Sequence, residues 1–153
     1  YDSITAVVPP HDVAIYRVEA QRRIEPRRYA AEWAYLPLFN DLGKRKKEIH
    51  YVIESKASGR RVVRYAGGCR ENAVVWPHVW SDQGGSYQMT VNCLPADNRG
   101  LEVIVNGETV ARFTSVTAEI SFPITLHSGY NLVEMTSRTT WAPDIDCFTL
   151  RPL

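Results

Sequence analysis

The chain of 153 residues lacks the sequence patterns that most enzymes and membrane proteins carry. No apolar run approaches the length of a membrane span. There is no G-x-S-x-G, G-x-x-x-x-G-K-[ST], G-x-G-x-x-G or H-E-x-x-H sequence, and the 4 histidines are scattered singly. Asp144 and Asp146 are the candidate carboxylate pair for glycoside hydrolysis. They are expected to lie close together on one strand, without the partner on the opposite side of a substrate that this reaction needs. We therefore expect no catalytic residues in this chain.

A strong charge of one sign and a paired set of cysteines are also missing. The formal net charge is +1, so no overall field favours nucleic acid or an anionic membrane as a partner. The short basic runs, such as residues 44–47, are typical of solvated loops. Cys69, Cys93 and Cys147 form an odd set without C-x-x-C spacing. Because Cys93 and Cys147 lie in strand-like stretches, we expect free core thiols rather than a disulfide framework.

What the chain does have is period-two alternation of apolar and polar residues in short runs. Tyr87, Met89 and Val91 alternate with polar residues, and the run at 101–105 ends at Asn106-Gly107, the strongest short signal for a type I′ hairpin. Further strands are expected at residues 61–65, 73–76, 109–113, 118–122, 130–135 and 145–150. Pro123 is expected at a strand edge or end, because it cannot donate to a ladder. This pattern predicts an all-β protein with a β-sandwich or jelly-roll fold.

The first part of the chain has a different composition. Residues 7–8 and 13–18 look like strand material around Pro9-Pro10, and residues 19–28 are charged and contain Pro26. We place a boundary near residue 24. Residues 1–24 are then the end of a preceding β domain plus a linker, and residues 25–153 form the compact module. The chain also starts at Tyr1 rather than at a methionine, so we interpret it as a piece of a longer protein.

Trp141 is the first candidate for a binding residue. It comes just before the last expected strand, so we place it on a loop at one end of the sandwich. An exposed indole ring there can stack on the C–H face of a sugar, and a neighbouring aspartate can accept hydrogen bonds from sugar hydroxyls. The alternative is that Trp141 only covers the end of the core.

A succession of short motifs resembles carbohydrate-binding modules of families six and thirty-five. The opening at 29–36 (YAAEWAYL) is similar to their Y-E-A-E start, and the closing segment at 143–146 (PDID) to their P-N-I-D-Y. Between them, in the family's order, come residues 57–59 (ASG), 65–68 (YAGG) with Asn72, 84–87 (GGSY), 101–107 (LEVIVNG) and 128–131 (SGYN). Each motif is weak alone, but together they cover residues 27–153.

The resemblance implies a galactose-binding-domain-like jelly roll with a sugar site on the loops at one end. Carried over position by position, the site consists of Tyr65, Gly67, Gly68, Asn72, Trp141 and Asp144. Trp141 is the expected stacking platform, and Asn72 and Asp144 are the expected polar contacts. Asp144 stands where an asparagine is common in the family, which implies altered hydroxyl selection or a metal-assisted contact. Arg70 is either a contact for an acidic sugar or an exposed loop residue.

The same resemblance implies a structural calcium ion. The matching ligand positions are Glu32 and Asp146, and oxygen ligands suit this hard cation. Ala30 replaces the first glutamate of the family's opening motif, which removes one carboxylate and weakens the expected site. The alternative is that Glu32 and Asp146 pair with nearby basic groups.

Residues 8–17 (VPPHDVAIYR) resemble the last strands of the C-terminal β domain of family twenty-seven α-galactosidases. The prediction is therefore a non-catalytic carbohydrate-binding module of an α-galactosidase-like glycoside hydrolase, located outside the cytoplasm (periplasmic or secreted). Its expected partners are a galactose-containing or uronic-acid glycan and the catalytic domain of the same chain, with no nucleic acid or membrane. The rival prediction is a structural β-sandwich module that packs on the catalytic domain without binding sugar. A stand-alone hydrolase would need an acid and a nucleophile that the sequence does not contain.

Overall fold

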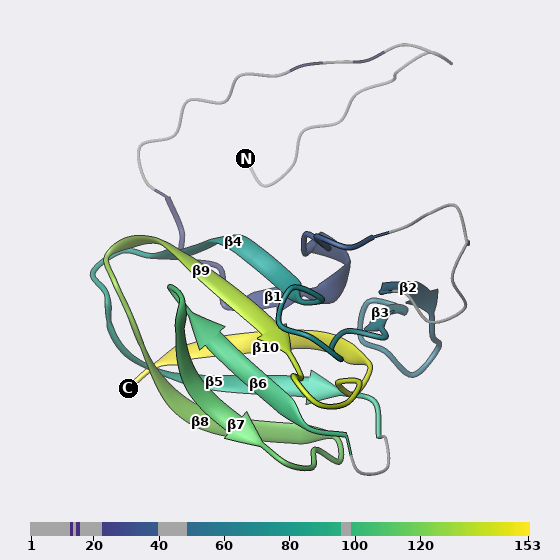
Figure 1. Ribbon diagram of the computed structural model, residues 1–153. Coiled ribbons are helices and arrows are strands. Elements are labelled where there is room, and N and C mark those ends of the chain that lie inside the picture. Colours follow the sequence, from purple (N-terminus) through teal and green to yellow (C-terminus); the bar gives the residue numbers. More distant parts are fainter. Residues whose placement is uncertain (1–12, 14, 16–22, 40–48, 96–98) are drawn as a thin grey trace.

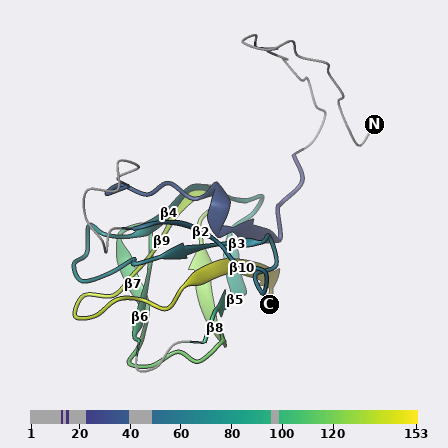
Figure 2. The same cartoon turned by 90° about the vertical axis from the view of Figure 1, so that its right-hand side faces the viewer.

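Two antiparallel β-sheets face each other in the computed structural model, which describes residues 13, 15, 23–39, 49–95 and 99–153 (Figures 1 and 2). The six-stranded sheet has the order β2-β3-β10-β5-β8, with β1 also paired to β10, and the four-stranded sheet has the order β4-β9-β6-β7. The elements are β1 (Arg28–Ala30), the short 3-10 helix η1 (Ala31–Trp33), β2 (His50–Ile53), β3 (Arg61–Arg64), β4 (Val74–Ser81), β5 (Gly85–Cys93), β6 (Leu101–Val105), β7 (Glu108–Phe113), β8 (Glu119–Leu126), β9 (Gly129–Thr136) and β10 (Ile145–Pro152). The predicted all-β sandwich is confirmed.

The core lies between the sheets and follows the alternation of the sequence. In β5, Tyr87, Met89 and Val91 are buried while the residues between them are partly exposed. Phe148 of β10 is fully buried, stacks on Tyr29 with ring centroids 4.8 Å apart, and meets the edge of Trp76 at 4.9 Å. Aromatic pairs in these geometries stabilise a core beyond the area that they bury.

Several local predictions are confirmed. Asn106 and Gly107 have φ angles of 51° and 86°, as a type I′ turn between β6 and β7 requires. Pro123 lies in β8, the edge strand of its sheet, where it disrupts no second ladder. The three cysteines are free, with Cys93 and Cys147 buried and Cys69 exposed.

Strand β10 organises the six-stranded sheet, because β1, β3 and β5 all pair with it. Ile145 lies opposite Cys93 and Cys147 lies opposite Asn92, so Asp146 is one extra residue on this strand. Such a bulge re-aims the side chain that it carries. It directs Asp146 to partners different from those of Asp144, although the sequence alone places both on one face.

The N-terminal predictions fall mainly outside the described residues. Of the segment 1–24, the structure describes 13, 15, 23 and 24, so the preceding β domain and the boundary near residue 24 stay predictions. In the part of the chain that is described, no helix has the length and apolar character of a membrane span.

Candidate functional site

Two loops meet at one end of the sandwich and bring the predicted sugar-site residues together. The loop between β3 and β4 carries Tyr65, Gly67, Gly68 and Asn72, and the loop between β9 and β10 carries Trp141 and Asp144. Backbone bonds join the two loops: the Gly68 N–H donates to Thr140 O at 2.9 Å, and the Ala142 N–H donates to Ala66 O at 2.7 Å.

Gly67 and Asn72 close the first loop. Gly67 has a φ of 104°, and a Cβ at this position would lie 2.5 Å from the carbonyl oxygen of Thr140, so a side chain here would force the two loops apart. Asn72 is buried, and its amide nitrogen donates to the carbonyl oxygens of Tyr65 at 2.8 Å and Gly67 at 2.7 Å. Both amide hydrogens of Asn72 therefore serve the loop itself, which leaves only its amide oxygen for a ligand.

Three rings line the site. Trp141 is half-buried, and the ring of Tyr65 meets it at an angle of 67° with centroids 5.7 Å apart. The ring of His50, from β2, lies 5.6 Å from that of Tyr65. Gly68 is exposed beside the indole, where a Cβ would come within 3.6 Å of the ring. The absence of a side chain at Gly68 leaves this part of the indole uncovered.

Asp144 is bound by two arginines that the sequence reasoning missed. Its Oδ2 accepts from Arg64 Nε at 2.6 Å, and its Oδ1 lies 3.4 Å from Nη1 of Arg99. The arginine side chains are 33% and 31% exposed, whereas that of Asp144 is 10% exposed. Each guanidinium has five N–H donors, so both arginines keep donors beyond their contacts with Asp144. The one sequence signal that could have indicated these partners is the position of Arg64, at the end of an expected strand and directly before Tyr65.

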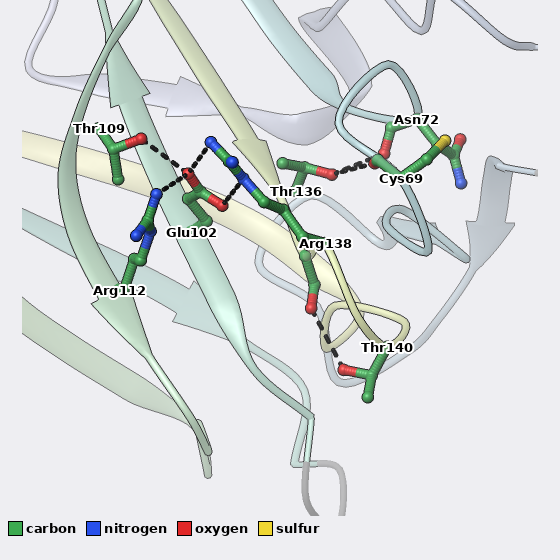
Figure 3. Close-up of polar contacts among 9 residues, drawn as sticks. Cys69, Asn72, Glu102, Thr109, Arg112, Thr136, Arg138 and Thr140 are labelled. Carbon is green, nitrogen blue, oxygen red and sulfur yellow. Dashed lines mark hydrogen bonds and ion pairs between the residues drawn. The ribbon is translucent and has the colours of Figure 1, made fainter.

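A buried carboxylate anchors the loop that leads to Trp141 (Figure 3). Glu102 of β6 is 4% exposed and accepts from Arg138 Nε at 2.7 Å and Arg138 Nη2 at 2.9 Å. Thr109 Oγ1 donates to it at 2.7 Å and Arg112 Nη2 at 3.3 Å. Burial alone would raise the pKa of Glu102, but the hydrogen bonds from Thr109, Arg138 and Arg112 outweigh it and hold the pKa below its ordinary value. The ionised form therefore fixes Arg138 at the start of the loop.

Thr136 links the same region to the first loop, as Figure 3 also shows. Its Oγ1 lies 3.0 Å from the carbonyl oxygen of Cys69 and 3.1 Å from that of Asn72. Both loops of the candidate sugar site are thus tied to the end of β9.

The predicted metal ligands meet at a separate corner. Ser58 donates to Asp146 through its backbone N–H at 3.0 Å and its hydroxyl at 2.9 Å. The carboxylate of Glu32 lies against Gly59, where a Cβ would be 2.1 Å from Glu32 Oε1. The other oxygen, Oε2, is buried without a hydrogen-bond partner.

These residues fit a hard cation better than they fit an internal ion pair. Among the described residues, no basic side chain pairs with Glu32 or Asp146; Arg28 donates to the hydroxyl of Ser58 instead. An unpartnered buried carboxylate oxygen is costly unless a cation compensates it. No cluster of three or more acidic, histidine or cysteine side chains exists within the described ranges, so serine or backbone oxygens and water would complete the coordination.

No protein-family model and no curated protein matches the sequence. Solved structures do match. A family 35 carbohydrate-binding module from Clostridium thermocellum aligns with a TM-score of 0.67 and 22% identity, over 80% of this chain and 96% of that chain. A family 35 module from Paenibacillus barcinonensis aligns with a TM-score of 0.63 and 20% identity, over 84% of this chain and 100% of that chain. This chain has the carbohydrate-binding-module fold.

A third structure is an exo-β-1,3-galactanase from Phanerochaete chrysosporium with bound β-1,3-galactotriose. It aligns with a TM-score of 0.65 and 22% identity, over 81% of this chain but 29% of that chain. At 20–22% identity, these three alignments show that the chain shares their fold.

Proposed function

We propose that this chain is a non-catalytic carbohydrate-binding module whose sugar site is the loop end around Trp141. The observation that carries the proposal is the half-buried indole held between two joined loops, with Tyr65 at its edge and two arginines nearby. Stacking on the indole provides apolar contact, and the guanidinium donors select oxygen-rich groups. Asp144 acts by holding Arg64 and Arg99 in place, and Asn72 by shaping the loop and offering its amide oxygen.

The proposed ligand is a galactose-containing or uronic-acid glycan. Arg64 and Arg99 outnumber Asp144, so the local charge favours a sugar that carries a carboxylate. Arg70 is exposed on the same loop as Gly68, but exposed Glu71 follows it, so this loop adds no net charge to the site. The galactanase with bound galactotriose is the ground for including galactosides.

We further propose that the module belongs to an α-galactosidase-like glycoside hydrolase outside the cytoplasm, with its catalytic domain in the same chain. The support is the resemblance of residues 8–17, nearly all of which lie outside the described residues. A tethered module raises the effective concentration of substrate at a catalytic domain even when it binds weakly.

Calcium is the proposed occupant of the corner at Glu32 and Asp146. When bound there, the ion would supply positive charge between η1, the turn at Ser58 and the bulge of β10. The support is the orphaned Oε2 of Glu32 and the approach of both carboxylates to one turn. Glu32 would contribute its buried oxygen, and Asp146 would stay oriented by the two donors of Ser58.

The test is calorimetric titration of the wild type and Trp141→Ala with galactose, galacturonate and galactose-containing oligosaccharides in calcium buffer. Trp33→Ala is the control for loss of an exposed indole, because Trp33 is 68% exposed and belongs to η1 rather than to either of the two loops. We expect binding to be lost in Trp141→Ala and retained in Trp33→Ala. Arg64→Ala should weaken galacturonate more than galactose. Absence of heat with every ligand would favour the structural module, and equal binding by the wild type and Trp141→Ala would show that the sugar site is not at Trp141.

A further inference from the structure

A second aromatic cluster lies at the opposite end of the sandwich from Trp141. Trp80 near the end of β4 pairs in register with Tyr130 near the start of β9, and their rings meet edge to face at 5.0 Å. The ring of His78 lies 5.2 Å from that of Tyr130. Strand β4 begins two residues after Asn72 and runs 8 residues to Ser81, which separates the two ends by roughly 23 Å.

Arg23 covers this cluster. Its Cζ atom lies 4.5 Å from the centroid of the Trp80 ring and 4.7 Å from that of Tyr130. Its Nη1 also donates to the Tyr130 hydroxyl at 2.6 Å. A guanidinium over two aromatic rings gains cation–π attraction from both, and the hydroxyl fixes its orientation.

Glu25 provides a second anchor two residues later. Its Oε1 accepts from the Tyr87 hydroxyl at 3.0 Å and from the backbone N–H of Asp82. Asp82 in turn accepts from the indole N–H of Trp80 at 2.7 Å. The two anchors therefore share the turn that follows Trp80, while Ile24 between them points to solvent with 82% exposure.

We propose that Arg23 and Glu25 form a clip that docks the segment before β1 onto Trp80, Tyr130 and Tyr87. The occupant of this aromatic surface is thus the chain itself. A charged, Pro-containing segment would otherwise behave as a flexible linker. With the clip closed, whatever stands N-terminal to Arg23 is joined to the sandwich by a fixed connection at the end away from the candidate sugar site. This inference does not depend on sugar binding.

The first experiment compares tryptic cleavage of the peptide bond after Arg23 in the wild type, Tyr130→Ala and Tyr35→Ala. Tyr35 is the matched control, since it is 61% exposed, against 57% for Tyr130, and has no part in the clip. Cleavage requires the segment to leave the surface, and its rate follows the population of that open state. We expect cleavage about fivefold faster in Tyr130→Ala, the factor that corresponds to a lost contact of about 1 kcal/mol. Equal rates in all three proteins would overturn the proposal.

A second measurement guards against a general loss of stability in Tyr130→Ala. Hydrogen exchange at the Asp82 amide is compared between Arg23→Gln and Arg27→Gln. Arg27→Gln is the control, because it removes the same charge from an exposed side chain four residues further along the chain. Exchange at Asp82 should rise severalfold in Arg23→Gln alone, while the amide of Val91 in the core stays unchanged. An Asp82 amide that responds equally to both substitutions would contradict a clip.

Discussion

Glu102 and Asp144 are each bound by two arginines, whereas Glu32 and Asp146 meet at the turn of Ser58 without a basic partner among the described residues. All four carboxylates are at least partly buried, so all four lose hydration on folding. Ion pairs with arginines replace the lost hydration of Glu102 and Asp144, and these ion pairs hold the loops of the candidate sugar site. In the described part of the chain, the second pair has no such partner, and the buried Oε2 of Glu32 accepts no hydrogen bond. This difference in charge compensation is the reason why a positioning role is proposed for the first pair and calcium binding for the second.

The largest expected effect is calcium-dependent stability. With free calcium at about a hundred times its dissociation constant, the ion should add about 2.7 kcal/mol and raise the Tm by about 5–10 °C relative to a chelator. Glu32→Gln should abolish this rise because it removes the buried charge. Differential scanning calorimetry with calcium or chelator measures it. Glu102→Gln serves as the control that keeps the response, and identical Tm values of the wild type with and without calcium would refute the metal site.

The next effect concerns the compensated carboxylate Glu102. Glu102→Gln should lower the free energy of unfolding by about 2 kcal/mol at pH 7, because Arg138 and Thr109 lose a charged acceptor. The pKa of Glu102 is held below its ordinary value of 4.5, so its contribution is complete above that pH and is lost as the pH falls through the lowered pKa. Urea unfolding of both proteins at pH 7 and in acid checks this. A difference that persists unchanged at pH 2 would show that charge is not its source.

A smaller effect is expected at Asp144. Asp144→Asn should lower the free energy of unfolding by about 1 kcal/mol, because Arg64 and Arg99 are one-third exposed and water replaces much of the lost interaction. The free energy of galacturonate binding should change by more than the free energy of unfolding, because Asp144→Asn releases the guanidinium groups of Arg64 and Arg99. Chemical denaturation and titration of the same preparation give both numbers. A stability loss above about 3 kcal/mol would place Asp144 with fully buried ion pairs instead.

The smallest effect is local, at Cys93. This residue lies opposite Ile145, which stands between Asp144 and Asp146 in the sequence. Burial, followed by the charges of Cys147, Asp146 and Asp144, raises the pKa of the Cys93 thiol to about 12. Cys93 should therefore resist alkylation at pH 8 while exposed Cys69 reacts. Mass-spectrometric mapping of labelled thiols distinguishes them, with denatured protein as the control in which all three react. Labelling of native Cys93 as fast as Cys69 would contradict this environment.

The fold was largely predictable because its signals are local. Alternation at Tyr87, Met89 and Val91 identified β5, and Asn106-Gly107 identified the hairpin. The expected strand at 73–76 was too short, because β4 continues to Ser81 through a register irregularity between Trp76 and Val79 that has no clear sequence pattern. The strands β1 and β2 were missed: β1 has three residues and pairs with residues more than a hundred positions away, and β2 has no alternation of buried and exposed residues.

The site was predictable in position more than in detail. The succession of motifs placed Tyr65, Gly67 and Trp141 at one end, where the structure brings them together. It could not give the partners of Asp144, since Arg64 reaches it from the end of β3 and Arg99 from the segment before β6, and arginines on a protein surface are common. The sequence also could not show that both amide hydrogens of Asn72 bond to backbone carbonyl oxygens of its own loop. These bonds depend on the path of the loop backbone, which no alternation pattern encodes.

Both ends of the sandwich chain lie beside the connection from β4 to β5: Glu25 accepts from the Asp82 N–H in the turn, and the Leu153 N–H donates to Ser86 O at the start of β5, at 3.0 Å. The segment that enters the sandwich and the strand that leaves it thus lie side by side, with the loops of the candidate sugar site at the other end. This arrangement separates the end at which the chain enters and leaves from the loops of the candidate sugar site. A domain joined at this end would leave the loops of the candidate sugar site uncovered, and changes in those loops would not alter the point of attachment.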